Sequence, residues 1–303
     1  MTNTYLDCFD FLRSTSGLET ASLIGNTGRF TTTQAQGSSS LTVPATGFGS
    51  ITVGLGFFDQ LTIFDGSQTE VVLVGSAGAA VGATSIPLVN PTQFAHAVGV
   101  PWCTDGIEGS LADQIVAASA WIERECYQPL LTTTWTSEPL YMPSMRAAIA
   151  NDGALTFRPR HWPVQSVSAI RLAYTPTLGT TYDATQVFID GNHRLCSVPN
   201  LIQFPASQSS NAIPPPPARS QSVQLQISYV SGYDYATIPE DLQEAAILVT
   251  ADMVAKRHNP VGATDLADGG SHITVVLRGD LTGESILIKR ALRTLAKYSV
   301  ELY

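Results

Sequence analysis

The stretch that decides the fold runs Val223-Gln-Leu-Gln-Ile-Ser-Tyr-Val-Ser-Gly-Tyr-Asp-Tyr-Ala-Thr-Ile-Pro-Glu-Asp-Leu242 and continues to Lys256-Arg-His-Asn-Pro260. From Val223 to Tyr229, apolar residues alternate with polar ones, which is the period of a half-buried strand. Gly232 breaks this alternation. The pattern therefore predicts a strand, a glycine turn and then a helix.

The predicted helix carries signals at both ends. Pro239 suits the first helical position, where its missing N–H is not needed, and Glu240 and Asp241 place negative charge at the positive end of the helix dipole. The basic residues 256–258 stand in the last turn, where positive charge is favoured, and residues 259–260 (Asn-Pro) stop the helix. The expected buried stripe consists of Leu242, Ala246, Val249 and Met253.

An earlier helix is predicted over residues 111–127. Ser110 and Asp113 form a capping box at its start, and Pro129 ends it. The two helices are expected to pack together as the core of a second domain, because each has one apolar stripe that is costly to leave in water. The candidate core residues are Leu111, Ile115, Ile122, Leu242, Val249 and Met253.

These blocks resemble the head-to-tail connector (adaptor) proteins of tailed bacteriophages. The pattern of that family is an aromatic-x-x-Gly-aromatic turn, a short gap, and Ile/Val-Pro-x-Asp-Leu opening a helix that ends in a basic residue. The helix at 111–127, the strand at 132–136 and the strand entry at 162–167 also resemble the family, so the resemblance covers roughly residues 108–303. In this sequence the pattern falls on Tyr229, Gly232, Tyr233, Ile238, Pro239, Asp241, Leu242 and Arg257.

The resemblance implies a structural virion protein and not an enzyme. Members of the family form a ring, of twelve copies, that binds beneath the portal protein and connects it to a tail, stopper or nozzle protein. Double-stranded DNA would pass through the ring without specific binding. Such a subunit would be made in the cytoplasm of the bacterial host and reside in the neck of the virion.

A terminal helix is predicted from about Gly283. Its apolar residues fall on one stripe, and its basic residues recur every fourth position on another. The resemblance implies that a C-terminal segment of this kind docks on the portal, whereas the alternative is a solvated basic face on an ordinary packed helix. The candidate docking residues are Ile288, Leu292 and Leu295 on the apolar stripe, with Lys289, Arg293 and Lys297 on the basic one.

Residues 1–107 are predicted to form a separate small all-β unit, a sandwich or a barrel, that folds independently. Asp65-Gly66 indicates a two-residue hairpin turn in which both residues take positive φ. Residues 5–12 are predicted as a short helix or an arm that packs on a neighbour. The strand candidates are residues 29–34, 40–43, 60–64, 68–74 and 84–89.

The predicted fold class is therefore α+β, with this β unit followed by a connector-like helical core (108–303) that contains inserted strands and ends in a helix. Residues 207–220, which include Pro214 to Pro217, favour an extended polyproline-type loop, either a stiff surface loop or a ligand for a partner. Further strands are predicted at 155–157, 164–172, 187–189 and 272–277.

Composition excludes several classes of protein. The net charge of −9 argues against a nucleic-acid-binding protein with a basic patch, because phosphate neutralisation supplies most of that affinity. Charged residues make up only 14%, against roughly a quarter in ordinary soluble domains, which fits either extensive burial against partners or a surface rich in Ser, Thr and Gln. No basic and apolar leader and no apolar segment long enough to cross a bilayer is evident, so a soluble protein with no membrane partner is expected.

The sequence offers little chemistry. The five histidines show no metal-binding spacing, no phosphate-binding glycine loop or nucleophile elbow is present, and neither a metal nor a cofactor is expected. The four cysteines form no C-x-x-C pair and are expected to be buried free thiols, a disulfide being the alternative. The alternative function is a carbohydrate-binding module or hydrolase, in which Trp102, Phe57 and Phe58 of the β-rich unit contact a saccharide.

Overall fold

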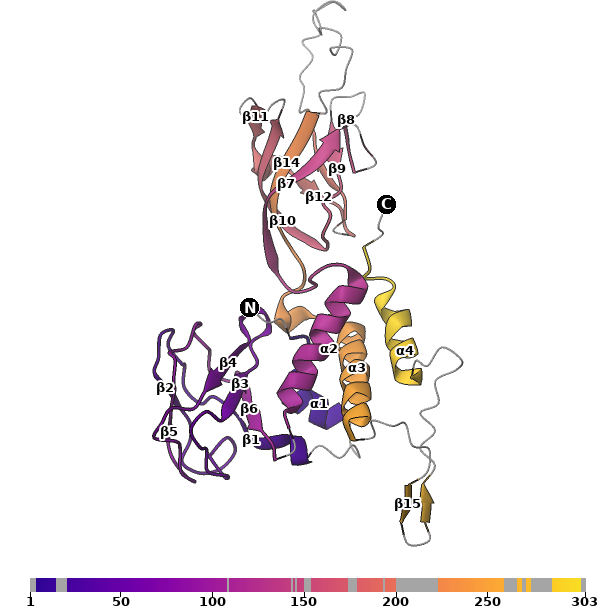
Figure 1. The fold of residues 1–303 in the computed structure, drawn as a ribbon. Coiled ribbons are helices and arrows are strands. Elements are labelled where there is room, and N and C mark those ends of the chain that lie inside the picture. The colour runs from indigo at the N-terminus through magenta and orange to yellow at the C-terminus, as the bar shows by residue number, and fades with distance from the viewer. Residues whose placement is uncertain are drawn as a thin grey trace, which may run out of the picture. The chain divides into compact units, whose positions relative to one another are not determined.

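The structure is a computed structural model, and it confirms the α+β class, with four α-helices and several antiparallel sheets in the part of the chain that it describes (Figure 1). The chain divides into two compact units. Unit 1 joins Met1–Tyr127 to Tyr235–Glu301, and unit 2 contains Gln128–Asp234. The described residues are 4–14, 21–107, 109–142, 144, 146–149, 154–173, 179–192, 194–199, 223–258, 266–268, 271–273 and 285–300.

The β-rich part of unit 1 contains a four-stranded antiparallel sheet of order β1-β6-β3-β4 and a two-stranded pair, β2 with β5. One apolar core joins them, and it includes Trp102, Phe30 and Leu41, all buried. Two short 3-10 turns accompany these strands, η1 (Ala21–Leu23) and η2 (Gly66–Gln68). A third turn of this kind in unit 1, η4 (Tyr235–Thr237), precedes helix α3 (Glu240–His258). The strands are β1 (Ile24–Arg29), β2 (Ser40–Thr42), β3 (Gln60–Ile63), β4 (Glu70–Leu73), β5 (Ser85–Pro87) and β6 (Pro101–Asp105).

The connection between β3 and β4 corrects one prediction. The two strands do pair as a hairpin, but Asp65 has φ −133° and only Gly66 has positive φ, at +55°. The hydroxyl of Thr69 accepts the Asp65 N–H at 3.1 Å and donates to the Gly66 carbonyl at 2.9 Å. The threonine therefore closes a longer connection built around η2, in place of the predicted two-residue turn.

The described part of unit 1 also contains four helices: α1 (Cys8–Ser14), α2 (Leu111–Cys126), α3 (Glu240–His258) and α4 (Ile286–Leu295). At the start of α2, the Ser110 hydroxyl accepts the Asp113 N–H at 3.1 Å, as the capping signal predicts. Figure 1 shows α3 between α2 and α4, and it packs against both. For this reason α3 is buried on more than one side and has no single apolar stripe.

The candidate core residues mostly lie inside this helical layer. Five of them have no exposed surface, whereas Met253 is half-buried. Positions between the predicted ones, such as Ala245, Thr250 and Val254, are buried as well, since α3 has neighbours on two sides. The five fully buried candidates are Leu111, Ile115, Ile122, Leu242 and Val249.

The N-terminal segment lies along α2 of the same chain. The Tyr5 N–H donates to the Ser119 hydroxyl at 3.3 Å, and the Tyr5 hydroxyl donates to Glu123 at 2.7 Å. A short helix, α1, follows. In the β-rich part, a Cβ on Gly66 would come within 2.8 Å of Tyr235 in η4. The β-rich part thus contacts the helices of unit 1, and its independent folding at a boundary near residue 107 stays a prediction.

Unit 2 is a two-sheet structure inserted between α2 and α3. One antiparallel sheet has the order β11-β10-β14-β7 and the other β12-β13-β9-β8, and side chains from both sheets share one apolar core. The short turn η3 (Ala184–Gln186) lies between β11 and β12. The strands are β7 (Thr133–Met142), β8 (Ala147–Ile149), β9 (Leu155–Phe157), β10 (Val164–Ala173), β11 (Gly179–Tyr182), β12 (Phe188–Ile189), β13 (Cys196–Val198) and β14 (Val223–Ser231).

The two ends of unit 2 are held together by backbone hydrogen bonds. The Tyr233 N–H donates to the Leu130 carbonyl at 2.7 Å, and the Thr132 N–H donates to the Tyr233 carbonyl at 3.0 Å. Gly232 has φ +101°, and a Cβ there would lie 2.3 Å from the Leu131 carbonyl oxygen. Only glycine fits this close approach, which explains the glycine of the strand-turn-helix pattern.

The four cysteines are free and buried, and they act as small apolar residues. The C-terminal strand prediction at 272–277 corresponds to β16 (Ser271–Ile273), which pairs with β15 (Leu266–Asp268), and its remaining residues lie outside the described ones. The proline-rich segment at 207–220 also lies outside them. No helix in the described ranges is long and apolar enough to cross a membrane.

Candidate interaction surfaces

The predicted docking helix packs on its own chain. Ile288 and Leu295 are buried in α4, which lies against α3, and the Ser285 hydroxyl caps the helix by accepting the Ile288 N–H at 3.1 Å. Two residues of the apolar stripe are therefore covered within the chain, and docking of this helix on a portal stays a prediction. Lys289 and Leu292 are half-buried.

The basic row of α4 divides into paired and unpaired residues. Lys297 forms an ion pair with Asp241 of α3, and the Tyr298 hydroxyl donates to the same carboxylate at 2.6 Å. Arg290, which was not among the docking candidates, pairs with Glu244. Arg293 is exposed and has no ion-pair partner within the residues that the structure describes. Arg293 is thus the member of the row that is free to meet a partner.

A buried histidine joins three parts of the β-rich segment. The His96 ring, with no exposed surface, contacts Asp65 through Nδ1 at 2.8 Å and Glu70 through Nε2 at 2.7 Å. Glu70 also accepts the Gln93 N–H at 2.8 Å. Burial acts against the charged ring, but the hydrogen bonds to Asp65 and Glu70 outweigh it and raise the pKa of His96 above its ordinary value.

This cluster is structural. The ring of His96 is closed off from solvent on all sides, so it cannot exchange protons with a bound substrate. Across the described residues, no group of three or more His, Cys, Asp or Glu side chains is arranged to hold a metal ion. The cluster joins the residues around the β3–β4 connection to the loop that precedes β6.

Trp102 is not available to contact a saccharide, as the alternative function requires. Trp102 is fully buried in the core of the β-rich part, where its ring stacks on Phe30 with centroids 6.4 Å apart. Phe57 and Phe58 are each about half exposed and lie with ring centroids 3.9 Å apart. Phe58 has φ +69°, an uncommon conformation for a bulky residue, in the turn before β3. The sequence could not distinguish the buried ring from the exposed pair.

Unit 2 contains a half-buried histidine, His161. The His161 ring stacks on Trp135 with centroids 3.7 Å apart, and its backbone N–H donates to the Tyr229 hydroxyl at 3.2 Å. That hydroxyl donates in turn to Glu138. Burial, followed by the charges of two nearby arginines, 160 and 146, lowers the pKa of His161 to about 4.

We expect the pKa values of the two histidines to be shifted in opposite directions from the ordinary value. The imidazole of His161 should titrate near pH 4, and that of His96 above 6.5, in a proton NMR titration of the folded protein. Because its folded pKa is depressed, His161 contributes stability above about pH 6.5 that is lost as the pH falls towards 4. Arg160→Ala should raise the His161 value only partly, since burial is the larger cause. A midpoint near 6.5 for His161 would contradict the half-buried stack.

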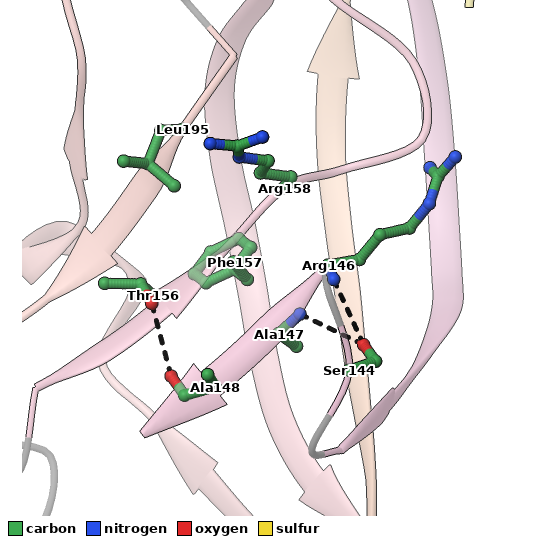
Figure 2. A pocket seen from close by; sticks show the side chains of 8 residues that line it. All are labelled: Ser144, Arg146, Ala147, Ala148, Thr156, Phe157, Arg158 and Leu195. Carbon is green, nitrogen blue, oxygen red and sulfur yellow. Dashed lines mark hydrogen bonds between the residues drawn. The ribbon is translucent and has the colours of Figure 1, made fainter. Parts of the chain in front are cut away.

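A pocket of 460 Å³ lies over β8, β9 and the approach to β13. Figure 2 shows the Arg158 side chain beside Leu195, whereas the Arg146 side chain extends in another direction, so the two guanidinium groups point away from each other. This pocket is not among the predicted sites, and the only signal for it is that Arg158-Pro-Arg160 lies close to Arg146 in a chain with few charges. The lining residues are Ser144, Arg146, Ala147, Ala148, Thr156, Phe157, Arg158 and Leu195.

No protein-family model matches the chain, and no curated protein matches it. A solved chain from the neck of an empty gene transfer agent (GTA) particle computed with C6 symmetry is 17% identical, over 64% of this chain and 78% of that chain, with a TM-score of 0.34. A chain from the virion of a native GTA particle is 16% identical over the same shares, also with a TM-score of 0.34. Similarity of this degree carries no conclusion about the function of this chain.

Proposed function

We propose that the protein is a structural, non-enzymatic subunit of a virion neck, a head-to-tail adaptor that forms a ring beneath the portal. The observation that supports this best is the role of the pattern residues. Gly232 makes the close turn that leaves unit 2, Leu242 is buried in the helical layer, and Asp241 binds Lys297 and Tyr298 next to α4. The residues shared with the adaptor pattern are thus those that join the strand, α3 and α4.

The proposed mechanism is assembly. Identical subunits close into a ring, twelve in the family, when the same head-to-tail contact repeats around an axis. The portal lies on one side of this ring, and a tail, stopper or nozzle protein lies on the other. A net charge of −9 disfavours retention of passing double-stranded DNA, because like charges repel. The subunit would be made in the host cytoplasm and retained in the virion.

Portal docking through the exposed side of α4 is part of this proposal. Arg293 is the cleanest position for a test, because Lys297 already binds Asp241 and its replacement would disturb the α3–α4 contact. Exposed charge changes usually alter stability by no more than about 0.5 kcal/mol. Arg293→Glu should therefore leave the subunit folded, while it slows attachment to the portal and makes attachment less sensitive to salt.

The measurement is the rate of portal binding across a salt series, with Arg13→Glu as the matched control. Arg13 lies in a different helix, α1, and its side chain is 84% exposed, so its reversal changes the net charge by the same amount outside α4. Normal binding by the Arg293 variant would place the docking surface elsewhere. Absence of portal binding by the unaltered protein would count against the adaptor function itself.

A further inference from the structure

Three arginines of unit 2 have side chains with no carboxylate partner among the described residues. Arg146, Arg158 and Arg160 have no ion-pair partner in the part of the chain that the structure describes. They are close in the fold, because β8 and β9 are neighbouring strands and the Arg158 N–H donates to the Arg146 carbonyl at 2.6 Å. Two of the three, Arg146 and Arg158, line the 460 Å³ pocket.

The basic residues of unit 1 are arranged differently. Arg29 lies 3.5 Å from Asp7, and Lys256 lies 2.7 Å from Asp252. Arg13, Arg124, Arg290 and Lys297 also have carboxylate partners. In unit 1, therefore, most of the positive charge is compensated locally.

The sequence divides its charge in the same way. Residues 128–234 contain six arginines, no lysine and five acidic residues, whereas the rest of the chain contains ten basic and twenty acidic residues. Unit 1 thus carries the whole surplus of negative charge, and unit 2 is slightly positive. Two copies that meet unit 1 to unit 2 gain from this difference, while contacts between like units do not.

The pocket favours carboxylate side chains over a nucleic-acid backbone. Arginine binds carboxylates through parallel N–H bonds, and the hydroxyls of Ser144 and Thr156 lie in the same lining. Phe157 and Leu195 add an apolar wall, which suits the methylene groups of Asp and Glu side chains. Duplex binding depends instead on many phosphate contacts by basic residues, and it is opposed by the net charge of −9.

We propose that this arginine-lined pocket binds acidic side chains on unit 1 of a second copy of the chain. The inference rests on the proposed function, because a contact between unlike units is the head-to-tail kind that repeats around a ring. Arg146 and Arg158 provide the positive side of the contact. The acidic surface of the neighbouring unit 1 provides the negative side.

The test is self-association of the full-length protein by sedimentation velocity at about 0.05 M and about 0.5 M salt, where charge screening is weak and strong. The unaltered protein should associate at low salt and less at high salt. Arg146→Glu with Arg158→Glu should weaken association about tenfold or more and remove most of its salt dependence. Arg13→Glu should associate as the unaltered protein does. Circular dichroism confirms that each variant is folded.

A mixing experiment tests the unlike-unit geometry. The double variant retains its acidic unit 1, so it should still occupy the pocket of an unaltered copy but accept no further copy itself. In equal mixture it should therefore shorten the assemblies of the unaltered protein. Mixtures that contain full-sized assemblies of unaltered copies alone, with free variant, would overturn the proposal.

Two further outcomes would also overturn it. The first concerns self-association: either the unaltered protein shows no association at low salt, or the double variant associates as well as the unaltered protein. The second is that the double variant loses binding to a fluorescent DNA duplex while its self-association is unchanged, in which case the pocket binds phosphate. Portal binding by the unaltered protein, measured in parallel, separates failure of the adaptor function from failure of this contact.

Discussion

Ile122→Asp and Leu242→Asp are each expected to leave the protein largely unfolded. Both side chains are fully buried in the α2 and α3 layer. Truncating such a residue to Ala costs about 2–5 kcal/mol, and an uncompensated buried carboxylate costs more. Because domains are stable by only about 5–15 kcal/mol, either change removes most of that margin.

Ala120→Asp is the matched control, because Ala120 lies in the same helix, α2, but is exposed. It should cost no more than about 0.7 kcal/mol, the difference in helix propensity. Urea unfolding followed by circular dichroism measures all three variants. Soluble, cooperatively unfolding protein from both Ile122→Asp and Leu242→Asp would show that the two helices do not form the core.

His96→Leu is expected to destabilise the β-rich part by about 3–5 kcal/mol, the usual cost of removing one partner from a buried charged group. The substitution leaves Glu70, which is buried, without its hydrogen bond from the ring. Asp65→Asn should cost less, because the Asp65 side chain is 29% exposed and water can replace part of its contact. The measurement is the urea midpoint of each variant beside that of the unaltered protein.

The loss should depend on pH in a defined direction. The pKa of His96 is raised in the folded state, so its protonation stabilises the fold fully below the unfolded value of about 6.5. That contribution is lost as the pH rises through the folded pKa. The difference in free energy of unfolding between the unaltered protein and His96→Leu should therefore become smaller from acidic to alkaline pH. A difference that grows with rising pH would contradict a charged His96 between two carboxylates.

The helices could be predicted because local signals agree at both ends. α2 begins after Ser110, as the capping pattern indicates, and α3 begins at Glu240, one residue later than the start predicted from Pro239. The packing of α3 could not be predicted as well. A stripe at 3.6-residue spacing describes a helix with one buried face, but α3 is covered by both α2 and α4, so Thr250 and Asp252 are buried too.

Strands defined by distant partners were harder to predict. β1 contains Gly25 and Gly28, which weaken its alternation, and β6 begins at a proline, so neither appeared in the predicted set. Both are fixed by tertiary pairing: Gly28 lies opposite Trp102, and a Cβ on Gly28 would clash with the chain at Gly49. The same pairing buries Trp102, which only the alternative function, a carbohydrate-binding module, places on a saccharide surface.

The pocket in unit 2 was even harder to predict from the sequence. Arg146 and Arg158 are twelve residues apart, and only the pairing of β8 with β9 brings their backbones together. Nothing in the spacing of two arginines predicts whether each has a carboxylate partner. Whether a carboxylate in the described residues pairs with each arginine is decided by the folded unit, as is the local pairing of the basic residues in unit 1.

The backbone hydrogen bonds between residues 130–132 and Tyr233 bear on how the two-sheet unit could be exchanged. The segments by which the chain enters and leaves the two-sheet unit are hydrogen-bonded to each other, so the two ends of this unit lie side by side. A short linker in place of residues 128–234 would still let α3 follow α2. A different inserted domain would need only two chain ends that lie equally close together. Gain, loss or exchange of this unit is thus open to evolution and to engineering without redesign of the helical layer.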